Sequence, residues 1–220
     1  MLAYQKIQPL HDQADGLRFE MLLRLKSTDG QMISPQSFLP SAERYGLATA
    51  LDVRALELTL NWLNANPSLQ HSLRHCCLNL SGATFANMDN ADLYISKIQE
   101  SGVAPEKICF EMTETATIAN LSSASEFMHK LSEIGCRFSI DDFGSGLSSF
   151  AYLRKLPIDF LKIDGLLVKD ILEDPTDFTL VKSINEMSKS MGKRTVAEFV
   201  ESPRLLNAVR DIGIDFAQGY

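Results

Sequence analysis

Polar side chains recur at one place along this chain, near the carboxyl end of each apolar, strand-like run. In chain order they are Glu20, Asn79, Glu111, Asp141 with Asp142, Lys162, Glu198 and Gln218. One carboxylate at a strand end is usually a loop residue or a helix cap, but seven strands that share the feature need a common explanation. Buried carboxylates repel one another, and burial without a counter-charge costs several kcal/mol for each group. A bound cation would remove this cost.

The types of ligand narrow the choice of cation. Carboxylate and amide oxygens without cysteine or histidine favour Mg²⁺ or Mn²⁺ over zinc. We interpret the four histidines as surface or packing residues; they are His11, His71, His75 and His129. The four cysteines form no C-x-x-C pair and lie in or beside apolar runs, which predicts buried, reduced thiols; they are Cys76, Cys77, Cys109 and Cys136.

Lys162 adds a cation to this set. In "LKID" it alternates with Asp164, so both side chains point to the same face of a strand. A lysine among carboxylates can be an ion-pair partner, or it can contact a phosphate or a water. Two reaction classes stay open. One is attack of water on a phosphodiester between two metal ions about 3.5–4 Å apart. The other is enolase-type proton abstraction, with Lys162 as the base and Mg²⁺ holding the enolate.

The composition is that of a soluble globular domain. The chain has 220 residues, of which 45% are hydrophobic and 22% charged, and this length fits one domain. The net charge of −7 argues against a large nucleic acid as partner. No apolar run reaches the ~18–20 residues that span a membrane, and the stretch "MLAYQKIQPL" lacks the charged region and apolar stretch of a signal peptide. We therefore expect a cytoplasmic domain that makes no membrane contact itself.

Strand-like and helix-like segments alternate along the chain. Strands are expected at 17–25, 76–81, 108–114, 137–143, 160–165 and 194–200, and weaker ones at 2–10 and 214–220. Helical periodicity covers 34–47, 51–66, 91–102, 123–135, 177–192 and 202–213. This alternation predicts a mostly parallel sheet, and about eight strands favour a closed barrel, whose carboxyl strand ends meet on one face. An open doubly wound sheet is the alternative, although no G-x-G-x-x-G follows the first strand.

Several motifs, taken together and in order, resemble the EAL domain family of cyclic di-GMP phosphodiesterases. They are Glu20-Met21-Leu22 within "FEMLLRL", then "FLPSAERYGL", "LNLS", "FEMTET", "DDFGSGLSSFAYLRKLPIDFLKID", "VAEFVES" and "QGY". The resemblance covers almost the whole chain. It implies an α/β fold, a modified TIM (β/α)8 barrel whose first strand runs antiparallel to the rest.

The resemblance also implies a site. It holds two Mg²⁺ or Mn²⁺ ions, is inhibited by Ca²⁺, and has the metal ligands Glu20, Asn79, Glu111, Asp141 and Asp142. The catalytic residues would be Glu20, Asp141, Lys162 and Glu198. The substrate-binding residues would be Gln5, Arg24, Asp164 and Gln218, with the Arg24 guanidinium on a substrate phosphate. The residues behind the metal ligands and in the lid loop would be Glu114, Gly144, Ser145, Gly146 and Glu201.

The implied reaction is hydrolysis of cyclic di-GMP to linear pGpG by metal-activated water. The alternative is a catalytically silent cyclic di-GMP receptor or regulatory EAL domain. The loop 143–150 would serve as lid and contact a second copy, so a homodimer is expected. We also expect that residues 1–220 are one EAL domain excised from a longer signalling protein, with a GGDEF or sensory domain and in some cases a membrane anchor.

Two residues depart from the family pattern. Met21 replaces the alanine of the name-giving motif, and it should face away from the site. Phe199 replaces the usual glycine of "VAEGVE", and its ring would either crowd the site or pack beneath it. The chain ends at Tyr220, close to Gln218, so the last strand is expected to fray.

Overall fold

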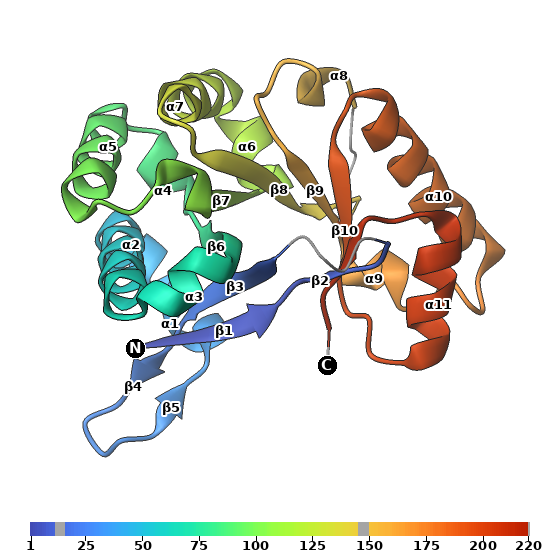
Figure 1. The fold of residues 1–220 in the computed structure, drawn as a ribbon, viewed down its shortest axis with the longest axis horizontal. Coiled ribbons are helices and arrows are strands. Elements are labelled where there is room, and N and C mark those ends of the chain that lie inside the picture. Colours follow the sequence, from blue (N-terminus) through green and yellow to red (C-terminus); the bar gives the residue numbers. More distant parts are fainter. Residues whose placement is uncertain (12–15, 145–149, 220) are drawn as a thin grey trace.

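A single sheet of nine strands forms the centre of the described chain (Figure 1). The structure is a computed structural model, and it describes residues 1–11, 16–144 and 150–219. Along the sheet the strands are β1 (Leu2–Lys6), β3 (Leu17–Leu23), β6 (Leu73–Asn79), β7 (Ile108–Thr113), β8 (Arg137–Phe143), β9 (Phe160–Ile163), β10 (Arg194–Ala197), β11 (Phe216–Ala217) and β2 (Gln8–Pro9).

The sheet closes into a barrel through the first strand. β1 and β2 lie at opposite ends of the strand order, yet only Ile7 separates them in sequence. β1 is antiparallel to β3 and β2 is antiparallel to β11, whereas the strands from β3 to β11 are parallel. The expected modified barrel with an antiparallel first strand is therefore confirmed. Ile7 bends that strand and donates its N–H to the Arg18 carbonyl at 3.0 Å.

Helices cover the outside of the barrel (Figure 1). The six periodic segments form α1 (Pro35–Arg44), α2 (Ala48–Ala65), α5 (Asp89–Ser101), α7 (Leu121–Glu133), α10 (Pro175–Ser190) and α11 (Pro203–Ile212). α5 and α11 each end at a glycine in the left-handed region, Gly102 with φ 72° and Gly213 with φ 87°. This conformation turns the chain from a helix back toward the next strand.

Several short elements have no counterpart among the predicted segments. They are α3 (Pro67–Ser72), α4 (Gly82–Phe85), α6 (Glu114–Ala119), α8 (Phe150–Leu153), α9 (Gly165–Val168), the 3₁₀ turn η1 (Pro105–Lys107), and the hairpin of β4 (Leu25–Lys26) and β5 (Met32–Ile33). Four to six residues span little more than one helical turn, so they carry no periodicity. The hairpin projects from the barrel near the N-terminus (Figure 1).

The barrel interior is built in layers, because side chains alternate along each strand. A buried apolar cluster fills its middle, the inner cluster: Ile7, Cys77, Cys109, Phe160, Val196 and Phe216. Two positions further along the same strands lie Asn79, Glu111, Lys162, Glu198 and Gln218. The polar residues at the strand ends thus share the inward face with the inner cluster. All four cysteines are free and buried, as predicted.

A second and larger apolar cluster packs between the strands and the helices. Tyr94 from α5, Phe127 from α7 and Phe110 from β7 are each 0% exposed there. The rings of Tyr94 and Phe110 meet edge to face at 5.5 Å. In the part of the chain that the structure describes, no helix has the length and apolar character to cross a membrane.

Candidate active site

Four carboxylates surround the ammonium of Lys162 at the carboxyl ends of the barrel strands. The Lys162 Nζ lies 2.9 Å from Glu198, 3.0 Å from Asp141, 3.1 Å from Glu111 and 3.4 Å from Glu20. The side chains of Lys162 and Glu111 are each only 1% exposed. Their positions come from β3, β7, β8, β9 and the residue after β10. The structure therefore brings together acids that are up to 178 residues apart in sequence, from Glu20 to Glu198.

Two amide side chains hold Glu20 in place. Gln218 Nε2 donates to Glu20 Oε2 at 2.6 Å and to Gln5 Oε1 at 3.1 Å. Asn79 Nδ2 donates to Glu20 Oε1 at 2.6 Å. Both carboxylate oxygens of Glu20 are thus hydrogen-bonded, and the carbonyl oxygen of the Asn79 amide remains as a ligand atom. Gln5 reaches this network because β1 pairs with β3 with Gln5 opposite Glu20.

We call the end of the barrel where the strands have their carboxyl ends, with Lys162 and its four carboxylate neighbours, the carboxyl mouth. The pKa values of its side chains reflect burial and one shared positive charge. Burial works to raise the pKa of Glu20, but attraction to Lys162 and hydrogen bonds from Gln218 and Asn79 lower it overall. Burial works to lower the pKa of Lys162, but the neighbouring carboxylates raise it well above its usual range. Burial raises the pKa of Glu111 and raises that of Glu198 to about 7. One ammonium does not neutralise the four acids around it, of which Glu20 and Glu111 are buried.

The oxygen atoms at this mouth fit a divalent cation. Asp141, Asp142 and Glu198 each offer an oxygen, and these atoms lie within 4.8 Å of one another. Asp141 Oδ1 is buried and makes no hydrogen bond, although the Lys162 ammonium is 3.0 Å away. Burial and the adjacent Asp141 charge raise the pKa of Asp142. An excess of negative charge and a donor set made only of oxygens match Mg²⁺ or Mn²⁺.

A cavity of about 440 Å³ opens beside this cluster. Its lining consists of Gln5, Leu22, Arg24, Ser34, Pro35, Gln36, Glu198, Phe199, Glu201, Gln218 and Gly219. The Arg24 side chain is half-buried, and its Nη1 donates to the Leu23 carbonyl at 3.0 Å. Ser34, Pro35 and Gln36 were not among the predicted site residues. The sequence analysis placed them at the start of a helix, but it did not predict the hairpin that precedes them.

Phe199 lies at the rim of this cavity, not beneath the site. Its φ is 54°, and its side chain is 61% exposed. The ring covers Gly165, where an added Cβ would lie 2.2 Å from Phe199 Cδ2. Asp142, also with φ 54°, is the other residue besides glycine with positive φ in the described chain. Both strained positions are at the carboxyl mouth, as is common at functional sites.

Glu114 connects the site to the loop that follows Asp142. Its carboxylate is buried at the start of α6, where it accepts the Gly144 N–H at 3.3 Å and the Tyr152 hydroxyl at 2.9 Å. Tyr152 was missed by the sequence analysis, although its position shortly after the glycine-rich loop was a usable signal. Ser145 and Gly146 lie outside the described residues.

Asp164 and Glu201 are placed differently from the other predicted site residues. Asp164 is buried and caps α9 by accepting the Leu166 N–H at 2.8 Å, and it does not line the cavity. Glu201 is exposed and lies on the cavity rim. The structure therefore gathers Gln5, Arg24 and Gln218 around the cavity and gives Asp164 a helix-capping contact.

The fold and the site define a class of protein: a (β/α) barrel with a cluster of acidic side chains at the carboxyl ends of its strands. Within that class the chain belongs to the EAL domain family, because the family model for the EAL domain matches residues 3–220. The family assignment made from the motifs is therefore confirmed.

Relatives of known name share this domain. The chain is 38% identical over 222 aligned positions to cyclic di-GMP phosphodiesterase PdeB of Shewanella oneidensis, covering 100% of this chain and 26% of that protein. It is 32% identical over 213 positions to cyclic di-GMP phosphodiesterase PdeF of Escherichia coli, covering 97% of this chain and 28% of that protein. The chain thus spans about a quarter of the length of these curated relatives.

A solved structure agrees in fold over the whole chain. The EAL domain of FimX from Pseudomonas aeruginosa, bound to c-di-GMP, matches with a TM-score of 0.92 at 26% identity. The match covers 100% of this chain and 87% of that one.

Proposed function

We propose that this chain is a metal-dependent phosphodiesterase that hydrolyses cyclic di-GMP to linear pGpG. The observation that carries the proposal is the convergence of four carboxylates on Lys162 beside a cavity that Arg24 lines. The names of the relatives PdeB and PdeF and the c-di-GMP bound to the FimX domain support this substrate. Enolase-type chemistry is less favoured, because Lys162 is held protonated by its carboxylate neighbours, whereas a base must be neutral.

Six side chains are assigned to the metal site. Glu20, Asn79, Glu111 and Asp141 would hold one Mg²⁺ or Mn²⁺, Asp141 and Asp142 would hold the second, and Glu198 would complete the site. When bound, such ions lower the pKa of a water and offset the negative charge of a phosphate. The fit rests on the oxygen-only donor set and on the convergence of oxygens from Asp141, Asp142 and Glu198 within 4.8 Å of one another.

Residues of the cavity bind and orient the substrate. Arg24 holds a phosphate through its planar guanidinium, and Gln5 and Gln218 form the adjacent wall. Asp164 is proposed as a further substrate contact through the carboxylate oxygen that does not cap α9. Phe199 at the rim bounds the space open to the substrate.

Lys162 and Glu198 act at the scissile phosphate. A water oxygen bonds to phosphorus and gives up a proton to solvent, the bond from phosphorus to the 3′ oxygen breaks, and that oxygen takes up a proton from solvent. Lys162 donates hydrogen bonds to the phosphate oxygens, on which charge grows in the transition state. Glu198, 2.9 Å from Lys162, orients the attacking water. Glu114 positions Asp141 and Asp142 through the following loop.

The larger assembly is also part of the proposal. We expect two copies to associate through the loop region after Asp142, and a longer chain to add a GGDEF or sensory domain. The short share of PdeB and PdeF that this domain covers supports a multidomain arrangement.

The test is turnover of cyclic di-GMP by the purified chain with Mg²⁺ or Mn²⁺, measured by chromatography of pGpG. A parallel sample with a chelator of divalent cations is the control, and it should form no product. If the chain binds cyclic di-GMP but forms no pGpG with either metal, the phosphodiesterase proposal fails and the receptor alternative holds.

A further inference from the structure

The amino end of the barrel carries a group of basic residues. Arg18, His75, Arg137 and Arg194 stand at the starts of β3, β6, β8 and β10 and share the inward face of the barrel. The Arg18 guanidinium lies 4.8 Å from the centre of the Phe216 ring in the inner cluster, and Arg18 is only 1% exposed. The amino end of the barrel therefore carries buried positive charge, although the net charge of the chain is −7.

The pKa of His75 reflects the positive electrostatic potential among these basic residues. It is 2% exposed, its ring lies 4.8 Å from the Phe160 ring, and its Nδ1 atom has no hydrogen-bond partner. Burial, followed by the positive charges of Arg18, Arg137, Arg194 and Arg74, lowers its pKa well below the usual range. The histidine is therefore neutral at physiological pH, and the positive potential here comes from the arginines.

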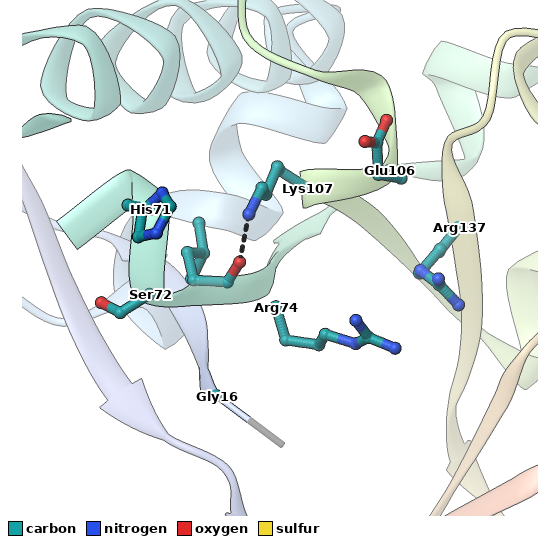
Figure 2. A pocket seen from close by; sticks show the side chains of 8 residues that line it. Gly16, His71, Ser72, Arg74, Glu106, Lys107 and Arg137 are labelled. Carbon is teal, nitrogen blue, oxygen red and sulfur yellow. Dashed lines mark hydrogen bonds between the residues drawn. The ribbon is translucent and has the colours of Figure 1, made fainter. Parts of the chain in front are cut away.

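A cavity of about 440 Å³ opens at this same end. Its lining consists of Gly16, His71, Ser72, Leu73, Arg74, Glu106, Lys107 and Arg137. Figure 2 shows the side chains of Arg74 and Arg137 extending toward the same space. Among the lining residues that the structure describes, Arg74, Lys107 and Arg137 are cations and Glu106 is a carboxylate, and this balance makes the cavity attractive to anions.

Two of these cations keep donor capacity for a ligand. Arg137 Nη1 pairs with Asp159 Oδ1 at 3.3 Å, but its Nε is buried and has no hydrogen-bond partner. Lys107 Nζ donates to the carbonyls of Leu73 at 2.5 Å and Gln70 at 3.1 Å, and neither carbonyl neutralises its charge. A buried N–H of a charged group that lacks an acceptor is costly, so an acceptor in the cavity would stabilise it.

We propose that this cavity binds a phosphate-bearing small anion, with Arg74 and Arg137 as its principal ligands and Lys107 as a third positive charge. The guanidinium fork matches the spacing of phosphate oxygens. The cavity exceeds the size of one phosphate, so a diphosphate or the phosphate chain of a nucleotide fits better than orthophosphate alone. This site is separate from the one at the carboxyl mouth, since Arg137 begins β8 and Asp141 comes four residues later on the same strand.

The test is calorimetric titration of pyrophosphate into the metal-free chain. Arg74 is exposed, so Arg74→Gln should fold normally, and it should weaken binding about tenfold through loss of one charged contact. Arg204→Gln, an exposed arginine on α11, is the matched control and should bind like the parent. Arg24→Ala reports on binding at the carboxyl mouth and should leave the affinity unchanged.

Three results would overturn the proposal: no binding by the parent chain, parent-like affinity of Arg74→Gln, or loss of binding in Arg24→Ala. Arg137→Gln should also weaken binding, but this variant loses its pair with Asp159, so its melting temperature is measured first. If Arg137→Gln does not fold, the affinity of Arg74→Gln alone tests the proposal. Orthophosphate and ATP are titrated in parallel into the parent and Arg74→Gln. Tighter Arg74-dependent binding of orthophosphate indicates a free phosphate as the ligand, and tighter Arg74-dependent binding of ATP indicates a nucleotide.

Discussion

The two ends of the barrel carry opposite charges, although the same strands contribute to both. The amino mouth is the end with Arg18, His75, Arg137 and Arg194, and the carboxyl mouth is the end with Lys162 and the acids around it. β8 starts at Arg137 and reaches Asp141 four residues later, and β10 starts at Arg194 with Glu198 four positions on. Four residues of strand span about 13 Å. The inner cluster, which includes Val196 between Arg194 and Glu198, fills the space between the two layers. This distance keeps the arginines from neutralising the acids, so each mouth retains its own potential.

The mouths differ in how their charges are balanced. At the amino mouth, Asp159 pairs with Arg137 and also accepts the Phe138 N–H at 3.0 Å, so a carboxylate of the chain itself offsets part of the charge. At the carboxyl mouth, four acids share Lys162, and the remaining negative charge is left for a cation from solution. The carboxyl mouth should therefore depend on metal far more than the amino mouth does.

The largest expected effect comes from removing a carboxylate at the carboxyl mouth. Glu20→Ala should lower turnover of cyclic di-GMP by about a thousandfold or more, because a proposed metal ligand and a partner of Lys162 are lost together. The fold should persist, as measured by circular dichroism. Glu106→Ala removes a carboxylate at the amino mouth and is the matched control with near-parent turnover. A near-parent rate in Glu20→Ala would refute the assignment of the site.

The second prediction separates binding from chemistry within the carboxyl mouth. Lys162→Ala should mainly lower kcat, by about a hundredfold, because its contact with phosphate strengthens in the transition state. Arg24→Ala should mainly raise KM, by about tenfold, because Arg24 holds a phosphate that does not react. Steady-state kinetics of both variants measure the split. The reverse pattern would mean that the two roles are exchanged.

The carboxyl mouth was largely predictable from the sequence. Strand-like runs of period two ended in acids and amides, and a parallel barrel brings such ends to one face. The long helices α2 and α10 were predictable for a similar reason, because their apolar residues repeat over many turns. The hydrogen bonds from Asn79 and Gln218 to Glu20 were not, since they depend on side-chain rotamers that sequence spacing does not specify.

The amino mouth was not predictable in the same way. The alternation that turns Asp141 and Glu198 inward also puts Arg137 and Arg194 on the same face. A basic residue at the start of an apolar run usually lies in solvent, however, so the sequence analysis did not select these two as members of a site. His75 was interpreted as a surface or packing residue, and it packs against Phe160. The short helix α8, which supplies Tyr152 to Glu114, was missed because four residues show no periodicity.

Divalent cations should stabilise the chain through the carboxyl mouth. At a Mg²⁺ concentration about 100 times the dissociation constant, binding adds about 2.7 kcal/mol, which raises the melting temperature of a chain of this size by roughly 5–10 °C. Asp141→Asn should reduce this shift, whereas Glu106→Ala at the amino mouth should keep it. Equal ionic strength in KCl is the control for screening.

Calcium tests whether occupancy and catalysis separate at that mouth. Ca²⁺ should raise the melting temperature as well, but it should support little turnover and inhibit in the presence of Mg²⁺, because it is larger and takes a looser coordination. Equal turnover in Ca²⁺ and Mg²⁺ would contradict the two-metal assignment.

The amino mouth should instead respond to acid. The pKa of His75 is lower in the folded chain than in the unfolded chain, where it is about 6.5. Below pH 6.5 the unfolded chain therefore binds a proton that the folded chain does not, and stability falls as the pH falls. Between pH 7.5 and 5.5 the free energy of unfolding should therefore fall by about 1 kcal/mol more in the parent chain than in His75→Gln.

Urea unfolding at the two pH values measures this difference. His71→Gln replaces an exposed histidine at the same mouth and is the matched control. Acids elsewhere titrate equally in parent and variant, so their contribution cancels in the comparison. An identical pH dependence in parent and His75→Gln would show that burial and the arginines around His75 do not disfavour its protonation.

The smallest expected effect concerns Glu114, which touches the carboxyl mouth only through its loop. Glu114 accepts the Gly144 N–H and the Tyr152 hydroxyl, and hydrogen bonds to a charged acceptor contribute roughly 1.5–3 kcal/mol each. Glu114→Gln keeps one carbonyl oxygen, so only part of this is lost. Mg²⁺ affinity should fall about threefold and self-association should weaken. Tyr152→Phe removes the Tyr152 donor alone and should have a smaller effect. Calorimetry and sedimentation test both variants, and a parent-like Mg²⁺ affinity with a parent-like dimer in Glu114→Gln would show that the loop holds Asp141 and Asp142 without Glu114.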